Sequence, residues 1–366
     1  MRKSRMDTRL LVSIILLVAA GFLIFLSASL GLLARDTVQF SSIALKQIFF
    51  GLVPGLIGLY IFSRIDYMKW RKIAFWFFAF AVVLNVAIFI PHLGLEHGGA
   101  TRWLLIGSFS LQTSEVLKIA AVIYFAAWLA FVKDAADFKK GFIPLIVMLV
   151  VTGGLCILQK DTDTLAIIAT ALVAMFVAAG GKWRHILYIG AIGIACLVIL
   201  AFTRPYVMSR IKTFIDPASA SPAASYQIDQ SLIAIGSGGV TGRGFGQSIQ
   251  KFNYLPEPIG DSIFAVAAEE FGLIGTLALV GLYLFFAMRS LKVASTAQNQ
   301  FGTLLAVGII TFIIIQSFTN IGSMTGVMPL SGVPLLFVSQ GGTALLFVLA
   351  ESGILLNISR TARLAK

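Results

Sequence analysis

The sequence contains few cysteines and few histidines. Its two cysteines, Cys156 and Cys196, both fall inside apolar stretches, where a thiol usually serves as a small apolar filler. The three histidines, His92, His97 and His185, show no spacing typical of a helical metal site, and no Ser-His-Asp order accompanies them. The sequence therefore implies no disulfide framework, and it offers no histidine metal site and no catalytic triad.

Charged residues are also scarce, at 12% of the chain against 58% hydrophobic residues, and the mean hydropathy is +0.93. A soluble domain of 366 residues cannot have this composition, so we predict an all-α polytopic membrane protein, with residues 1–366 forming a single membrane domain. A helical span needs about 20 apolar residues. Ten such stretches occur, at Leu10–Leu33, Ser42–Phe62, Ile73–Ile90, Val116–Phe131, Phe142–Leu158, Thr164–Ala179, Ile186–Phe202, Ser262–Met288, Phe301–Phe318 and Gly341–Ile358.

The positions of lysine and arginine orient these helices, because basic residues collect in loops on the cytoplasmic side. With the N-terminus inside, most of the 28 basic residues fall in inner segments, so both termini are predicted to be cytoplasmic. The long segment 204–260, between predicted helices 7 and 8, then lies outside. This topology and the attraction of basic residues to anionic membrane lipid explain the net charge of +12, so we expect no nucleic-acid partner.

Three outer loops are predicted to face the same compartment and to converge over one cavity: His92–Leu111, Arg204–Gly260 and Ile321–Gln340. The longest contains a low-complexity part, Asp216–Ser225, which we expect to be mobile. It is followed by Tyr226–Gly236, whose apolar spacing predicts a helix along the membrane interface.

The glycine-rich run Gly236–Gly246 resembles a phosphate-binding loop only superficially. It lacks the Gly-Lys-Ser/Thr ending, and no strand-helix-strand unit surrounds it. Two interpretations stay open: a flexible turn, or backbone amides that approach a phosphate together with Arg243.

Ionisable residues in membrane spans are costly, and each is a candidate for function. Glu115 and Lys118 are three residues apart, on one helical face, and form either a structural ion pair or part of a site. Asp161 and Asp163 lie at a helix entry, where capping is the alternative to function. Arg102, next to Trp103, is either an interfacial anchor or a site residue. Glu269, Glu270 and Glu351 lie deeper, and we expect them to face the bundle interior or a hydrated cavity.

Asp261 is the most informative single residue. In the segment Leu255–Phe264 two prolines and Gly260 delay the start of an apolar helix, and the carboxylate falls at its entrance. A side chain at this position can cap the helix, or it can act as a base that the positive end of the helix keeps ionised. The two roles are compatible.

Many short motifs resemble, in order along the chain, the signature of the SEDS family, which comprises FtsW, RodA and SpoVE. The matching residues are Gly99, Ala100, Arg102, Trp103, Gly107, Gln112, Ser114, Glu115, Lys118, Tyr226, Gln227, Gln230, Ser231, the run Ala234–Gly239, Gly242, Gly244, Gly246, Ser248, Lys251, the run Tyr254–Glu257, Asp261, Ile263, Phe264, Ala265, Glu269, Glu270, Gly272, Asn320, Ile321, Gly322, Gly326, Pro329, Gly332, Phe337, Ser339, Gly341 and Gly342. The resemblance spans essentially the whole chain.

The resemblance implies a peptidoglycan glycosyltransferase that polymerises lipid II at the outer face of the bacterial cytoplasmic membrane. Asp261 is then the general base on the 4-hydroxyl of the acceptor GlcNAc, while the bond between MurNAc C1 and undecaprenyl pyrophosphate breaks in the donor. The substrate-binding candidates are Arg102, Lys118, Arg243 and Lys251 as cations for the pyrophosphate, with Glu115, Asp161, Gln227 and Ser339 as supporting polar residues. No cofactor is required by the sequence, although a divalent cation, Mg²⁺ or Mn²⁺, often accompanies pyrophosphate.

The subtype and the partner also follow only from the resemblance. The ungapped run Gly242–Leu255 resembles the division type, FtsW, more than the elongation type, RodA, whereas Pro334 is closer to RodA. Thr113, Lys160, Asp163, Ser262, Leu336 and Gln340 depart from the family pattern. The expected partners are a class B penicillin-binding protein, which is a transpeptidase, and other proteins of the division complex. The alternative functions are a RodA-like polymerase, a lipid II flippase and a non-catalytic scaffold for a transpeptidase.

Overall fold

The computed structural model of the chain describes residues 6–33, 37–97, 100–107, 109–132, 134–216 and 222–361. The elements are α1 (Thr8–Leu33), α2 (Thr37–Lys46), a π-helical turn η1 (Gln47–Leu52), α3 (Val53–Arg64), α4 (Met68–Ala87), β1 (Gly94–His97), β2 (Ala100–Ile106), β3 (Phe109–Gln112), α5 (Thr113–Phe131), η2 (Phe138–Phe142), α6 (Ile143–Leu158), α7 (Thr162–Ala178), α8 (Trp183–Thr203), α9 (Pro205–Ile215), α10 (Pro222–Gly238), α11 (Ile263–Ser295), α12 (Gln300–Met324) and α13 (Gly342–Thr361). Outside the described residues lie Arg2, Lys3, Arg5, Lys133, Arg363, Lys366 and, from the low-complexity part, 217–221.

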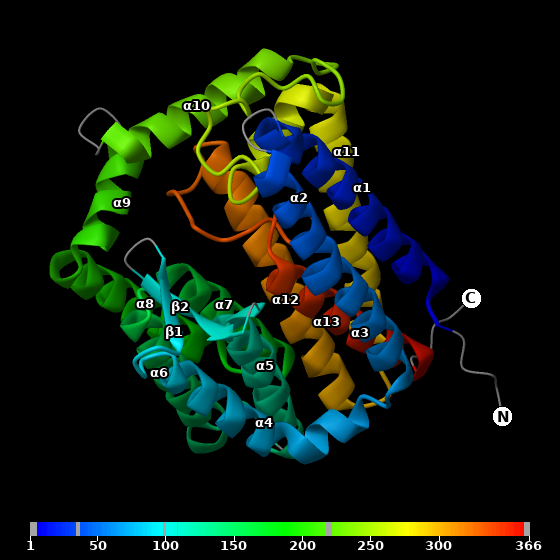
Figure 1. Cartoon of the computed structure of the whole chain (residues 1–366). Coiled ribbons are helices and arrows are strands. Elements are labelled where there is room, and N and C mark those ends of the chain that lie inside the picture. The colour runs from blue at the N-terminus through cyan, green and yellow to red at the C-terminus, as the bar shows by residue number, and fades with distance from the viewer. Residues whose placement is uncertain are drawn as a thin grey trace.

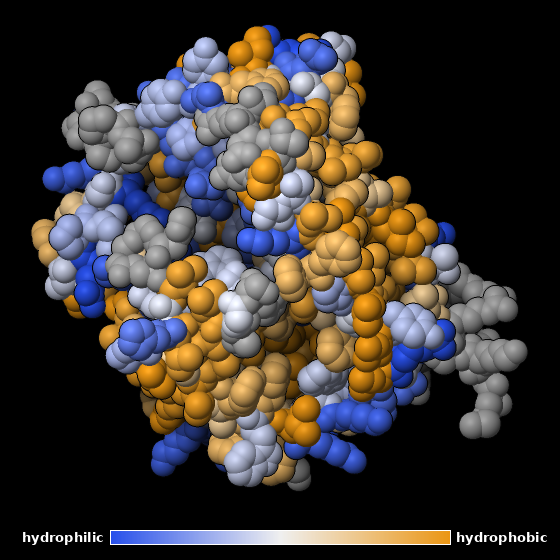
Figure 2. Space-filling view, viewed as in Figure 1, coloured by the Kyte–Doolittle hydropathy of each residue, from blue (hydrophilic) through white to orange (hydrophobic). Residues whose placement is uncertain are grey.

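The prediction of a polytopic helical membrane protein is confirmed. Within the described ranges, nine helical segments are long and apolar enough to cross a membrane, and α7, with 17 residues, is a shorter apolar helix. These segments follow the predicted stretches in order. Large apolar side chains such as Trp76 and Phe202 are exposed on their outer faces, and hydrophobic residues cover the flanks of the bundle in Figure 2. A lipid environment explains such exposure.

The start of α1 and the end of α13 lie at the same end of the bundle, in agreement with two termini on one side of the membrane (Figure 1). The amide of Asp7, just before α1, donates a hydrogen bond to Oγ of Ser359 in α13, with 3.1 Å between the two atoms. Arg289, near the end of α11, pairs with the Asp7 carboxylate at 2.5 Å. These contacts join the first and last spans to α11.

The long segment 204–260 lies across the opposite end of the bundle (Figure 1), and its described residues contain the helices α9 and α10. The helix predicted at Tyr226–Gly236 is confirmed within α10, whereas α9 was not predicted. Hydrophilic residues gather in the region of these helices in Figure 2, and the surface is hollowed between α9 and the helices below it.

The structure corrects the all-α prediction in one place, because the loop His92–Leu111 forms a small antiparallel sheet with the strand order β1-β2-β3. Leu95 pairs with Trp103, and Trp103 also pairs with Gln112 on the other side. The turn after β2 begins at Gly107, whose φ of 62° suits glycine. This sheet was not predicted from the sequence because its strands are short and lie between long apolar runs.

The stretch predicted as one span, Ser262–Met288, is instead two helices that meet at Gly272, which has φ 64° and ψ −164°. The first half, before Gly272, is buried, so Asp261 precedes a short half-helix rather than a complete span. A broken helix exposes backbone groups that must find partners inside a membrane protein. The neighbouring glycine-rich run supplies these partners.

Four backbone hydrogen bonds join that run to the break. The amides of Arg243 and Gly244 donate to the carbonyls of Glu269 and Glu270, and the amides of Leu273 and Ile274 donate to the carbonyls of Gly239 and Val240. A Cβ at Gly242 would lie 2.1 Å from the Glu270 carbonyl oxygen, so the close approach requires glycine there. The run therefore completes the broken helix, and these amides of Arg243 and Gly244 already have partners. The flexible-turn interpretation gives way to this structural role, and phosphate binding by the run with Arg243 stays a prediction.

Candidate active site

The backbone around Asp261 is held by polar side chains from other elements. Asn320 of α12 donates Nδ2 to the carbonyl oxygen of Asp261 at 2.7 Å. Ser339 donates Oγ to the carbonyl oxygen of Gly260 at 2.8 Å, and Gln227 of α10 donates Nε2 to Oγ of Ser262 at 3.1 Å. The predicted polar residues Gln227 and Ser339 therefore fix the segment that carries Asp261.

The carboxylate of Asp261 itself does not cap the helix, contrary to one of the two predicted roles. The N-cap residue is Ser262, whose side chain makes no capping hydrogen bond. Across the described part of the chain, the Asp261 carboxylate has no hydrogen-bond or ion-pair partner closer than the usual limits for such contacts. The structure thus fastens the main chain of this residue and leaves its side-chain oxygens available.

The three predicted outer loops do converge, and their meeting point is the start of α7. Arg102 of β2 lies 3.9 Å from Asp161, and Arg210 of α9 lies 2.7 Å from Asp163. The amide of Gly332, from the third loop, donates to Oδ2 of Asp163 at 3.1 Å.

The capping role considered for Asp161 is confirmed. Its carboxylate accepts hydrogen bonds from the amide of Thr164 at 3.4 Å and from the Thr164 hydroxyl at 2.9 Å. Arg102 also donates to the carbonyl oxygen of Lys160, directly before the cap. Arg102 is therefore held at the entrance of α7 by a carboxylate and by a backbone carbonyl, with 19% of its side chain exposed.

The same cluster surrounds the Asp261 carboxylate. A methyl group placed on Gly332 would lie 3.7 Å from Oδ2 of Asp261, 3.7 Å from Nη2 of Arg210 and 4.0 Å from Oδ2 of Asp163. Burial, together with the negative charges of Glu257 and Asp163, raises the pKa of Asp261 to about 7, against the opposing effect of the two arginines. A carboxyl group with this pKa exchanges a proton near neutral pH.

Glu115 and Lys118 form the predicted ion pair, with Nζ of Lys118 2.9 Å from Oε1 of Glu115. Both side chains are almost completely buried, and Lys118 also donates to Oε1 of Gln316 at 2.6 Å. Gln316 in turn donates Nε2 to the carbonyl oxygen of Pro334 at 3.3 Å. The Glu115–Lys118 pair is therefore connected, through Gln316 of α12, to the loop that contains Gly332 and Pro334.

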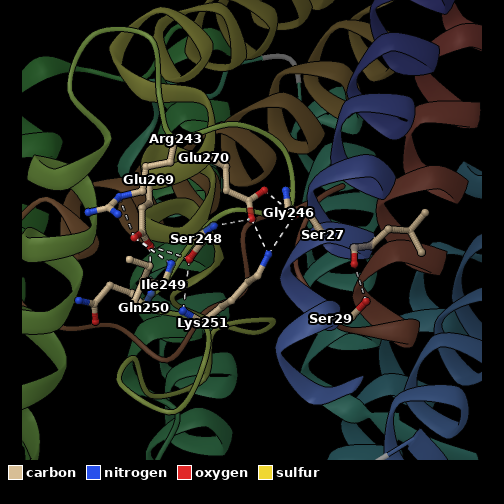
Figure 3. A network of polar contacts seen from close by, with 11 residues as sticks. Ser27, Ser29, Arg243, Gly246, Ser248, Ile249, Gln250, Lys251, Glu269 and Glu270 are labelled. Carbon is tan, nitrogen blue, oxygen red and sulfur yellow. Dashed lines mark hydrogen bonds and ion pairs between the residues drawn. The ribbon is translucent and has the colours of Figure 1, made fainter. Parts of the chain in front are cut away.

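Lys251 lies in a separate buried network, shown in Figure 3. Its Nζ is 2.7 Å from Oε1 of Glu270 and 3.4 Å from Oγ of Ser27, and its side chain is fully buried. Ser27 of α1 also donates to Oε2 of Glu270 at 2.5 Å and accepts from the amide of Gly246 at 3.1 Å. Lys251 thus joins α1, the glycine-rich run and the half-helix after Asp261.

Arg243 and Glu269 extend this network (Figure 3). Nε of Arg243 lies 3.3 Å from Oε1 of Glu269, and Ser248 donates Oγ to Oε2 of the same carboxylate at 2.6 Å. The expectation that Glu269, Glu270 and Glu351 face the interior is confirmed, since none is more than 2% exposed. The structure therefore pairs two of the predicted cations, Arg243 and Lys251, with Glu269 and Glu270, whereas the charge of the predicted cation Arg102 acts on Asp261.

Sequence reasoning did not select Arg210, Glu257 or Asn320 as site residues. Asn320 belongs to the motif set that resembles the SEDS signature, so a signal for it existed. Arg210 falls in α9, in a part of the long outer segment for which no helix was predicted, and its orientation depends on Asp163, 47 residues earlier in the chain. No local pattern could have indicated that contact.

The fold and the site define a polytopic membrane protein in which two arginine-aspartate pairs meet the Asp261 carboxylate, which has no partner among the described residues, at one end of the helical bundle. The chain belongs to the FtsW/RodA/SpoVE family, since the family model described as "Cell cycle protein" matches residues 7–364. It is 34% identical over 363 residues to the stage V sporulation protein E of Bacillus subtilis, covering 99% of both chains. It is 35% identical over 365 residues to the probable peptidoglycan glycosyltransferase FtsW of Trichlorobacter lovleyi, covering 100% of this chain and 96% of the relative.

Two solved structures share the fold. The first is a chain from the structure on structural coordination of polymerization and crosslinking by a peptidoglycan synthase complex. It matches this chain with a TM-score of 0.80 at 23% identity, over 98% of each chain. The rod shape determining protein RodA of Thermus thermophilus matches with a TM-score of 0.71 at 22% identity, over 98% of each chain.

Proposed function

We propose that the chain is a peptidoglycan glycosyltransferase that polymerises lipid II during cell division, with Asp261 as the general base. The observation that carries the base assignment is the Asp261 carboxylate, which has no partner in the described part of the chain. Its pKa is raised to about 7, and Asn320 fixes its backbone. A general base works best when its pKa lies near the operating pH. The relatives named as glycosyltransferases support the reaction class.

The proposed step is a direct displacement at MurNAc C1. An Asp261 oxygen takes the proton of the 4-hydroxyl of the acceptor GlcNAc, and the hydroxyl oxygen attacks C1 of the donor sugar. The bond from C1 to the pyrophosphate oxygen breaks with its electron pair, so undecaprenyl pyrophosphate leaves and the anomeric configuration inverts. Asp261 then releases its proton to water.

The leaving pyrophosphate needs positive charge within the site that holds the base. Among the cations predicted from the sequence, we propose Arg102, because its charge acts on Asp261 and its side chain is partly exposed. Lys118 is buried against Glu115, and Lys251 is buried against Glu270, so we propose supporting roles for both. Arg243, paired with Glu269, supports the glycine-rich run.

A divalent cation stays a proposal that depends on the pyrophosphate. In the described ranges, no group of three or more His, Cys, Asp and Glu side chains is arranged to hold a metal ion. Mg²⁺ or Mn²⁺ would therefore reach the site through phosphate oxygens, and the steps above use only the side chains of this chain.

The orientation and the partner belong to the same proposal. With the basic termini in the cytoplasm, the Asp261 cluster faces the outer side of the membrane, where lipid II is polymerised. We propose a class B penicillin-binding protein, acting with other division proteins, as the partner. The likeness of the fold to a chain from a peptidoglycan synthase complex supports this partner class.

The test uses the purified chain in liposomes with labelled lipid II, with and without its transpeptidase, and compares wild type with Asp261→Asn. Asp229→Asn, an exposed position on α10, is the matched control. We expect polymer from the wild type and from the control, and none from Asp261→Asn. Polymer of normal yield from Asp261→Asn refutes the base, and transfer of lipid II between leaflets without any polymer favours a flippase.

A further inference from the structure

Arg210 lies beside the base and is oriented by a single carboxylate. Its Nη1 donates to Oδ1 of Asp163 at 2.7 Å and to Oδ2 at 2.8 Å. Asp163 is itself fixed by the amide of Gly332. Because one guanidinium nitrogen makes both contacts, the orientation of Arg210 is set while most of its donors stay unused.

The unused donors lie close to Asp261. Within the described part of the chain, Nε and Nη2 of Arg210 have no hydrogen-bond partner, and 30% of the side chain is exposed. Nη2 and Oδ2 of Asp261 both lie 3.7 Å from the point where a Gly332 side chain would begin, so they are no farther apart than twice that distance. The gap exists because residue 332 has no side chain.

We infer that Arg210 contacts the pyrophosphate of the lipid-linked donor and stabilises the charge that develops on it. This inference rests on the proposed function. An inverting displacement places the base and the leaving group on opposite sides of one carbon, and the two carboxyl groups of inverting glycosidases are roughly 6.5–9.5 Å apart for a similar reason. Twice 3.7 Å is 7.4 Å, so the largest separation that these contacts allow between Oδ2 of Asp261 and Nη2 of Arg210 falls within this range.

The charges of the site favour a contact between Arg210 and the leaving pyrophosphate that strengthens during the reaction. Glu257, Asp161, Asp163 and Asp261 outnumber Arg102 and Arg210 in the free site, so an anion does not bind there by net charge alone. When Asp261 takes the proton of the acceptor it becomes neutral, and the positive charge of Arg210 is then shared with fewer anions. The guanidinium therefore interacts more strongly with the leaving group in the transition state than in the ground state, which is the condition for catalysis.

The test compares Arg210→Ala and Arg210→Lys with Lys212→Ala, which removes an exposed charge from the same helix. We expect Arg210→Ala to lower kcat about 100- to 1,000-fold, as loss of one transition-state donor does elsewhere, with a smaller effect on KM. Arg210→Lys should recover part of the activity, since it restores the charge without the planar fork. Lys212→Ala should match the wild type.

Two further readouts separate catalysis from a merely structural contact. The positive charges of Arg210 and Arg102 lower the pKa of Asp261, whereas Glu257 and Asp163 raise it. Arg210→Ala should therefore move the acid limb of the kcat/KM profile, which reports the free enzyme, to higher pH. Undecaprenyl pyrophosphate should inhibit the wild type more strongly than undecaprenyl phosphate, and Arg210→Ala should reduce that preference.

A second variant, Gly332→Ala, tests the gap without changing any charge. The added methyl group would make ordinary contacts with Arg210 and Asp261, so we expect a folded protein with reduced turnover. Activity of Arg210→Ala within twofold of wild type overturns the inference, as does lost activity with an unchanged pH limb and an unchanged preference for pyrophosphate. If Arg210→Ala does not fold, normal turnover of Gly332→Ala overturns it. Wild type and Asp261→Asn are measured alongside. If Asp261→Asn polymerises as well as the wild type, that result refutes the proposed function instead.

Discussion

Substitution of Lys251 by Met should destabilise the protein strongly, because it leaves Glu270 buried without its ion-pair partner (Figure 3). The two charges are 2.7 Å apart, and their attraction is about 6 kcal/mol at an effective dielectric constant of about 20. Desolvation of both groups offsets much of this attraction. Removal of one partner of a buried pair nevertheless costs about 3–5 kcal/mol, since the remaining charge is uncompensated.

A double substitution separates the cost of the unpaired Glu270 charge from the cost of lost packing at Lys251. In Lys251→Met/Glu270→Gln both charges are gone, and the glutamine oxygen can still accept from Ser27. We expect the double variant to recover most of the stability. Lys292→Met, which removes an exposed lysine from α11, is the control and should behave like the wild type.

The assay is thermal unfolding of the purified proteins in one detergent, followed by circular dichroism. Lys251→Met should unfold roughly 5–10 °C below the wild type, from the usual relation between free energy and Tm. A Tm within about 1 °C of the wild type, or a double variant less stable than Lys251→Met, would refute the assignment of Lys251 as a structural partner of Glu270 and return it to the list of pyrophosphate candidates.

Two further predictions concern pH. Glu257 raises the pKa of Asp261, so Glu257→Gln should shift the acid limb of polymerisation from about pH 7 to lower pH, measured as initial rate against pH; an unchanged limb contradicts the electrostatic argument. Folding raises the pKa of Asp261 above its unfolded value of 3.8, so its contribution to stability is complete below about pH 4 and is lost as the pH rises through about 7. Asp261→Asn should therefore show a smaller fall in Tm between pH 4 and pH 8 than the wild type, and equal falls in the two proteins count against the raised pKa.

The sequence predicted the spans well because apolar length is a local property. Every predicted stretch has a helical counterpart, and the pair Glu115–Lys118 followed from helical spacing alone. The break at Gly272 could not be predicted in this way, because it depends on backbone bonds from the distant residues Arg243 and Gly244.

The site was predicted in part. Asp261 was selected from its position at a helix entrance, although the capping interpretation was wrong. Gln227 and Ser339, named from the resemblance, do hold its segment, whereas Lys251 and Arg243 have other partners. A lysine in a polar loop looks the same in a sequence whether it is buried against a glutamate or exposed to substrate. Only the packing of α1 against α11 distinguishes these cases.

The most direct test of the central claim is the rate of glycan polymerisation by Asp261→Asn in liposomes, with its transpeptidase present and Asp229→Asn as control. We expect Asp261→Asn to fold, to bind lipid II and to make no detectable polymer, while Asp229→Asn matches the wild type. Polymerisation by folded Asp261→Asn at the wild-type rate would contradict this claim.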